Sequence, residues 1–133
     1  MSIPIALEAL HDEIQGHGSV AFFLSGGGDG RPHCVQLAIA WEDPGRLVLH
    51  PGKGTVANVA ERPLVSVLWP PTEEGGYSLI VDGTVVDTST DADGHPTVVV
   101  EPTKAVLHRP AKPADPTATA HGSDCVKVFS PTP

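Results

Sequence analysis

The sequence has few cysteines, few aromatic residues and few basic residues. Its two cysteines, Cys34 and Cys125, lie far apart with no C-x-x-C spacing, so no disulfide framework is expected and their pairing is left open. Eight basic against sixteen acidic residues give a net charge of −8, which opposes binding to nucleic acid or to an anionic membrane. No apolar run approaches the ~20 residues of a membrane-spanning helix.

The first fifteen residues carry acidic rather than basic side chains, so no signal peptide is expected and the protein is predicted to be cytoplasmic. A chain of 133 residues with 40% apolar residues is long enough for one domain with its own core. We assign that domain to residues 1–110. Residues 111–133 are rich in Pro, Ala and Thr and are predicted to form an extended C-terminal arm, which ends in a short strand over Asp124–Phe129.

Fourteen glycines and fourteen prolines leave little room for long helices and favour short strands joined by turns. Ile3, Leu7, Leu10 and Ile14 share one face of a predicted N-terminal helix, with Ser2 as its N-cap and with Gly16 and Gly18 ending it. A second helical segment is predicted over Thr55–Glu61, with Thr55 as N-cap. Besides the C-terminal strand, six strands are predicted, at 19–25, 32–41, 46–50, 64–69, 77–86 and 97–107, and residues 87–94 are predicted to form a solvated loop. This spacing predicts a closed or nearly closed antiparallel β-barrel.

The segment from Pro51 to Asn58 is a candidate phosphate site. A strand enters it and a short helix leaves it, so its glycines and the helix N-terminus would present backbone N–H groups to an anion. Lys53 adds a positive charge, and Thr55 and Asn58 add hydrogen-bond donors. The segment lacks the spacing of a nucleoside-triphosphate loop. An ordinary strand-to-helix connection capped by Thr55 is the alternative interpretation.

Residues that usually carry catalysis form no recognisable constellation. No pair of histidines has zinc-site spacing, and adjacent His33 and Cys34 would face opposite sides of a strand. No G-x-S-x-G elbow is present, and the paired acids fall in turns. His33 and His50 are candidates to line a pocket, with ordinary surface or strand-end positions as the alternative.

The stretch from Ser19 to Arg109 resembles the pyridoxamine 5′-phosphate oxidase-like family. The resemblance rests on the glycine-rich loop at Gly52, the short helix stopped before Pro63, and the strand 64–69 followed by two prolines. Gly30-Arg31-Pro32-His33 is similar to the opening of the family's preceding long strand, and Asp82-Gly83-Thr84-Val85 is similar to a later one.

This resemblance implies a mainly β fold, an antiparallel split β-barrel of about six to seven strands with an N-terminal helix and one short helix after the third strand. It also implies a homodimer that binds FMN or the deazaflavin F420 at its interface and transfers hydride to or from a small molecule. The implied cofactor-binding residues are His33, Gln36, His50, Lys53, Gly54, Thr55, Asn58 and Trp69. No catalytic side chain and no metal ligand is implied, because the cofactor would supply the redox chemistry.

Three positions depart from the family's pattern. Lys53-Gly54-Thr55 stands where flavin-binding members have Ser-Arg-Lys, and His33 and Ala38 stand where two further basic residues are expected. Charge-assisted hydrogen bonds to phosphate are worth roughly 1.5–3 kcal/mol, so their loss would weaken binding. The alternative function is therefore a split-barrel binding module that has lost the redox cofactor.

Overall fold

The structure is a computed structural model that describes residues 1–111. The predicted strand Asp124–Phe129, Cys125 and all of the C-terminal arm beyond its first residue lie outside this part of the chain. Within residues 1–111, no helix is both long and apolar enough to cross a membrane.

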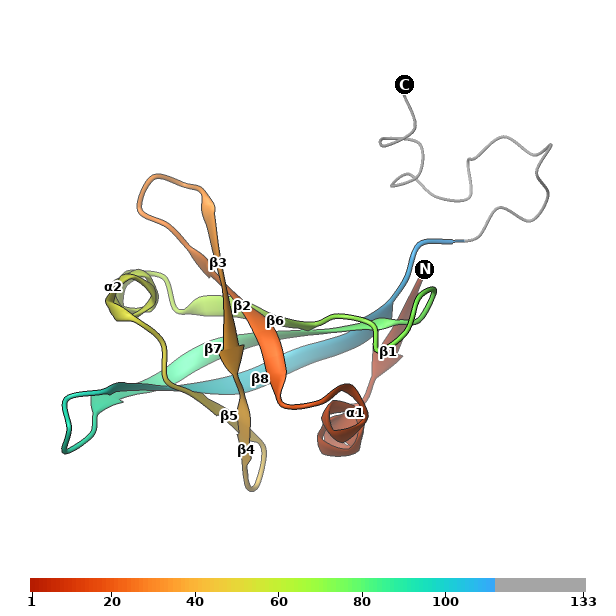
Figure 1. Ribbon diagram of the computed structural model, residues 1–133, viewed down its shortest axis with the longest axis horizontal. Coiled ribbons are helices and arrows are strands. Elements are labelled where there is room, and N and C mark those ends of the chain that lie inside the picture. Colours follow the sequence, from red (N-terminus) through yellow and green to blue (C-terminus); the bar gives the residue numbers. More distant parts are fainter. Residues whose placement is uncertain (112–133) are drawn as a thin grey trace.

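The chain forms one antiparallel sheet with two α-helices (Figure 1). The sheet has the strand order β3-β2-β6-β7-β8-β5-β4, with β1 paired to the far end of β8. The elements are β1 (Ser2–Ile5), a single 3-10 turn (Leu7–Ala9), α1 (Leu10–His17), β2 (Val20–Gly26), β3 (Pro32–Ala38), β4 (Ala40–Glu42), β5 (Arg46–Leu49), α2 (Lys53–Glu61), β6 (Leu64–Trp69), β7 (Ser78–Thr90) and β8 (Pro96–His108).

The two ends of the sheet are joined by the chain itself. β3 begins the strand order and β4 ends it, yet only Ile39 separates them in sequence. The Ile39 N–H donates to the Ser19 carbonyl at 2.7 Å, so the chain leaves β2 and turns to pair with β5 at this residue. One predicted strand over 32–41 is therefore divided between the two edges of the sheet, and the sheet curls into a barrel. The predicted split β-barrel is confirmed.

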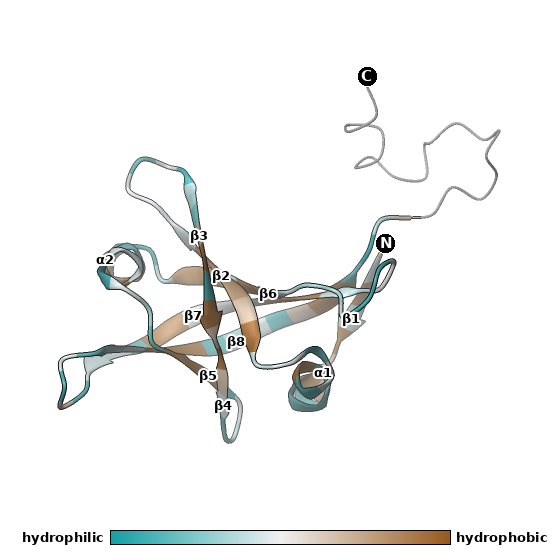
Figure 2. Ribbon diagram, viewed as in Figure 1, coloured by the Kyte–Doolittle hydropathy of each residue, from teal (hydrophilic) through white to brown (hydrophobic). Residues whose placement is uncertain are grey.

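The core lies inside this barrel. Alternate side chains of β2, β6 and β7 point inward, as the period of two along a strand requires. Figure 2 shows the apolar colouring concentrated on the central strands and the hydrophilic colouring on the hairpins. The completely buried large side chains include Phe23, Leu47, Trp69, Leu79 and Val100.

The predicted N-terminal helix exists, but its predicted start is wrong. Residues Ser2–Ile5 form β1 and pair in register with Ala105–His108, so Ser2 is not an N-cap. The α-helix begins only at Leu10, buries Leu10 and Ile14, and ends at Gly18, whose φ of 101° suits glycine. Gly16 lies within the helix rather than ending it.

The last two strands are longer than predicted. β7 continues to Thr90, so only residues 91–94 of the predicted loop at 87–94 remain outside a strand, together with His95. β7 and β8 each have thirteen residues and pair along nearly their whole length, with irregularities after Asp82 and Val85. Mutual pairing of two long strands supplies hydrogen bonds to polar residues that a local pattern assigns to a loop.

Candidate functional site

The N-terminus of α2 carries the predicted phosphate site. The helix begins at Lys53 with Gly52 as its N-cap residue, and no side chain caps it, so the prediction that Thr55 is the N-cap is wrong. The first intrahelical bond runs from the Val56 N–H to the Gly52 carbonyl, at 3.2 Å. The N–H groups of Lys53, Gly54 and Thr55 therefore have no intrahelical acceptor, and the helix dipole adds a partial positive charge there.

Space beside this helix end is open. A Cβ atom built on Gly52 or on Gly54 meets no other atom within 4 Å. Both glycines are exposed, and neither adopts a positive φ. The folded chain thus gives no steric reason for glycine at either position, whereas a close approach of an anion to the backbone would give one.

Polar side chains connect the helix to the hairpin of β2 and β3. Thr55 is only 2% exposed, and its hydroxyl lies 3.5 Å from Nδ1 of His33 on β3. Asn58 donates its side-chain amide to the hydroxyl of Ser25, which is 4% exposed. His33, Lys53, Gly54, Thr55 and Asn58 therefore lie near one another, where the sequence predicts a phosphate site.

Two residues at this place were not predicted. Ser25 is one of two buried polar residues in the described chain, and it accepts the Asn58 hydrogen bond. Arg62 follows the helix and donates Nε–H to the Gly26 carbonyl at 2.7 Å, which fixes the start of the hairpin loop. The position of Ser25 directly before the glycine run 26–28 could have indicated its role at this site. No sequence signal indicated Arg62, because the carbonyl that it binds is thirty-six residues away.

Three other predicted cofactor residues lie elsewhere. Nδ1 of His50 is 3.3 Å from the Pro96 carbonyl and 3.2 Å from the Thr97 hydroxyl, so its side chain is directed to the start of β8. Gln36 is exposed on the outer face of β3, opposite to the face of His33. Trp69 is completely buried and donates its indole N–H to the Gly18 carbonyl at 3.0 Å. Trp69 is therefore a core residue of the described chain.

A groove of about 560 Å³ lies on the outer surface, between the hairpin loop and strands β6 and β7. The loop contributes Gly30 and Arg31, and the strands contribute Leu64, Ser66 and Asp82. The Ser66 hydroxyl donates to the Asp82 carboxylate at 2.7 Å. None of the first-turn residues of α2 lines this groove, but Ser25 and Gly26, which accept hydrogen bonds from Asn58 and Arg62, do.

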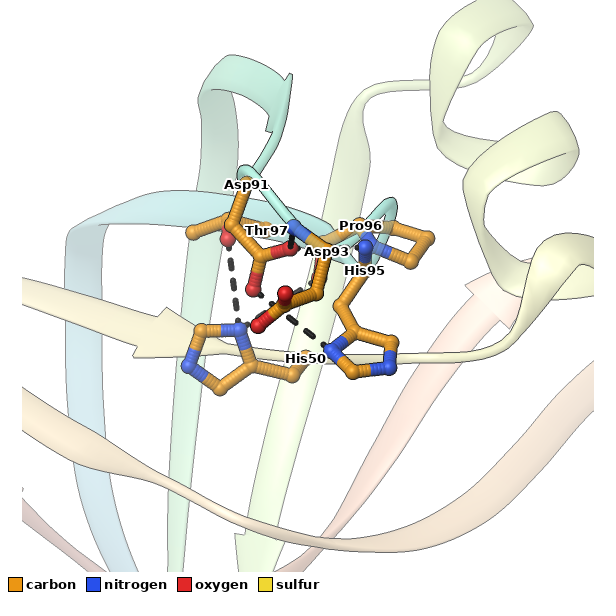
Figure 3. Close-up of polar contacts among 6 residues, drawn as sticks. All are labelled: His50, Asp91, Asp93, His95, Pro96 and Thr97. Carbon is orange, nitrogen blue, oxygen red and sulfur yellow. Dashed lines mark hydrogen bonds and ion pairs between the residues drawn. The ribbon is translucent and has the colours of Figure 1, made fainter.

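The turn between β7 and β8 brings together two aspartates and a histidine (Figure 3). The ligand atoms of Asp91, Asp93 and His95 lie within 4.8 Å of one another, and all three residues are exposed. The Asp91 carboxylate accepts the backbone N–H groups of His95 and Asp93, and these bonds, that from His95 first, hold the pKa of Asp91 below its ordinary value. Closing this turn accounts for the position of Asp91 without any bound ion.

The chain is similar in sequence to two curated proteins. No protein-family model matches the chain. Over 83 residues the chain is 49% identical to an uncharacterized protein of Mycobacterium bovis and, to the same extent, to one of Mycobacterium tuberculosis. Each match covers 59% of this chain and 56% of the relative, so the chain spans just over half the length of the curated relatives it matches.

Solved structures share the fold over most of this chain. An F420 reductase superimposes with a TM-score of 0.56 and 18% identity, over 65% of this chain and 87% of that one. A protein of Clostridium acetobutylicum from the pyridoxinephosphate oxidase family superimposes with a TM-score of 0.60 and 13% identity, over 79% of this chain and 91% of that one. An FMN-binding protein of Syntrophomonas wolfei superimposes with a TM-score of 0.61 and 8% identity, over 80% of this chain and 86% of that one. The chain has the split-barrel fold of pyridoxamine 5′-phosphate oxidase-like proteins, and the resemblance seen in the sequence is confirmed at the level of the fold.

Proposed function

We propose that the protein is a cytoplasmic oxidoreductase that binds FMN or F420 with the cofactor phosphate over the N-terminus of α2. The observation that carries the proposal is the open, uncapped first turn of this helix, with two glycines whose missing Cβ atoms leave room for a ligand. Three free N–H groups, the helix dipole and the exposed ammonium of Lys53 would all attract a phosphate. The solved proteins with this fold include an F420 reductase and an FMN-binding protein, which supports a cofactor of this class.

The residues present fit the phosphate end of such a cofactor. Lys53, Gly54 and Thr55 would donate backbone N–H groups, and His33 would face the same anion from β3. Asn58 holds Ser25 and would fix the wall behind the phosphate. A bound flavin or deazaflavin would supply hydride transfer to or from a small molecule, and this chain would supply its position and electrostatics.

The proposed active unit is a homodimer. The outer face of the sheet carries a continuous row of partly exposed apolar side chains, Phe22, Leu68, Ile80 and Val106, which are register partners across four strands. Exposed apolar patches of this kind are typical of association surfaces. Gln36 pairs with Phe22 and belongs to this face, so in a dimer formed through it Gln36 would approach the partner rather than its own α2. A monomer in analytical ultracentrifugation at micromolar concentration would contradict this assembly.

A test of the cofactor site can use the open glycine. Gly54→Leu adds a side chain where a Cβ meets nothing, so the fold should keep its melting temperature while access to the first turn is blocked. Ala57→Leu, on an exposed position of the same helix, is the matched control. Calorimetric titration with FMN and F420 should show at least about tenfold weaker binding for Gly54→Leu and unchanged binding for Ala57→Leu. Equal affinities for the two variants would place the phosphate elsewhere.

The second candidate function is a split-barrel module without a redox cofactor. It is favoured by the first turn of α2, where Lys53 is the one cationic side chain and Gly54-Thr55 replaces the basic residues of flavin-binding members. Purified protein without flavin or deazaflavin absorbance that also fails to bind either cofactor in titration would favour this function. Coloured protein, or saturable binding of either cofactor, would exclude it.

A further inference from the structure

Helix α1 covers the bend of the chain between β3 and β4 with an aromatic pair. The His11 imidazole stacks on the Trp41 indole with ring centroids 4.6 Å apart and an angle of 3° between the planes. The Trp41 Nε1–H donates to the Asp43 carboxylate at 3.0 Å. The indole is therefore held on one face by His11 and at one edge by Asp43, although both rings stay partly exposed.

A cavity of about 360 Å³ opens beside this pair. His11 and Trp41 form its aromatic wall, Ile14 and Ile39 are buried at its base, and Gln15 and Ser19 are exposed residues of its lining. Small-molecule sites typically have volumes of about 300–1,000 Å³, mostly apolar walls and a few polar groups that orient the ligand. The cavity has all three features, and none of its residues belongs to the proposed phosphate site.

The charge around the cavity limits what could bind there. Asp12 lies next to His11 on α1, and the Asp43 carboxylate is bonded to Trp41. No lysine or arginine lines the cavity. Neither carboxylate belongs to the lining, but both neighbour its aromatic residues, so an anionic ligand would be repelled, whereas a neutral or cationic ring would meet an aromatic wall and a negative surrounding.

From these observations we infer that the cavity beside His11 and Trp41 is a second binding site, one that takes a small planar aromatic molecule of neutral or positive charge. Its ligand class is opposite in charge to the phosphate expected at α2. Figure 1 shows α1 and α2 well apart on the barrel, so the cavity is separate from the helix end expected to hold the phosphate.

Three bicyclic probes of one shape and different charge test the inference: quinoline, N-methylquinolinium and quinoline-2-carboxylate. Binding to the full chain is followed by NMR shifts of the Trp41 indole N–H and the Gln15 side-chain amide. We expect saturable shifts with quinoline and N-methylquinolinium, and at least about tenfold weaker binding of the carboxylate. Absence of saturable shifts with the neutral and cationic probes would overturn the inference.

Two variants test whether the probes bind in this cavity. His11→Ala removes one aromatic wall and should weaken quinoline binding, while His95→Ala in the distant β7–β8 turn should leave it unchanged. Gln15→Lys changes an exposed helical residue, so it should fold normally. This variant should reverse the charge preference: binding of N-methylquinolinium should weaken and binding of quinoline-2-carboxylate should strengthen. Binding unaffected by both His11→Ala and Gln15→Lys would show that the probes bind elsewhere and would refute the site.

Discussion

Nδ1 of His33 lies 3.5 Å from the hydroxyl of Thr55, and this contact connects strand β3 to the first turn of helix α2. The pairing places an imidazole ring beside the free N–H groups that would bind a phosphate. The ring can therefore offer a side-chain hydrogen bond to the anion that these N–H groups would hold.

A contribution of His33 to anion binding follows from this contact. His33→Ala removes the ring that lies beside the first turn of α2, so the affinity for FMN or F420 should fall about two- to tenfold, because one hydrogen bond to the phosphate is lost. Calorimetric titration of both proteins measures the change. An unchanged affinity would mean that His33 does not face the anion.

Reversing the charge of Lys53 should weaken anion binding. Lys53→Glu replaces attraction by repulsion at the helix N-terminus, and a loss of at least about 1.4 kcal/mol, a factor of ten, is expected for FMN or F420. Arg46→Glu makes the same change in net charge on β5, where the arginine is half exposed and only 3.6 Å from Glu101. That control should lose much less affinity in the same titration. Similar losses for both variants would indicate a general charge effect rather than a phosphate site.

Gly83 should tolerate no larger residue. A Cβ atom there would lie 2.6 Å from Cγ1 of Val100 and 2.8 Å from the Glu101 carbonyl oxygen, at the irregularity where β7 meets β8. Gly83→Ala should lower the free energy of unfolding by about 1–3 kcal/mol, because backbone as well as side chain must move. Gly16→Ala, on α1 with no atom within 4 Å, should instead raise it by up to about 1 kcal/mol. Urea unfolding of both variants tests the pair, and an unchanged midpoint for Gly83→Ala would contradict the close approach.

The Asp91 carboxylate should stabilise the β7–β8 turn in a pH-dependent way. Hydrogen bonds from the backbone N–H groups of His95 and Asp93 lower the pKa of Asp91, so folding favours its ionised form. This contribution is fully present above the ordinary carboxyl pKa and is lost as the pH falls through the lowered one. Asp91→Ala should speed amide hydrogen exchange of His95 at neutral pH.

Asp93→Ala is the matched control in the same turn, because the Asp93 side chain accepts neither of these bonds. Its amide exchange should stay close to that of the wild type. If both variants exchanged alike, the Asp91 hydrogen bonds would not be what holds the turn.

Local sequence predicted much of the barrel and the segment that carries the proposed anion site. The apolar alternation of Leu64–Trp69 and the prolines after it predicted β6 with its observed bounds, because a buried strand and its stop signals lie within one short window. The segment around Thr55 likewise predicted a short helix ending at Glu61, although α2 begins at Lys53 rather than at the predicted Thr55. The period of two along β3 predicted that adjacent His33 and Cys34 lie on opposite faces, as they do.

Tertiary structure decided which of those faces is inside and which residues meet. Ile3 continued the helical spacing of Leu7 and Leu10, yet Ser2–Ile5 became a strand because its backbone pairs with residues more than a hundred positions away on β8. Trp69 was a plausible ring contact until the barrel buried it under Gly18, and His11 met Trp41 only through the packing of α1 on the bend between β3 and β4. Hydrogen bonds and burial supplied by distant segments outweigh local propensities of a fraction of a kcal/mol per residue, and no local window contains those segments.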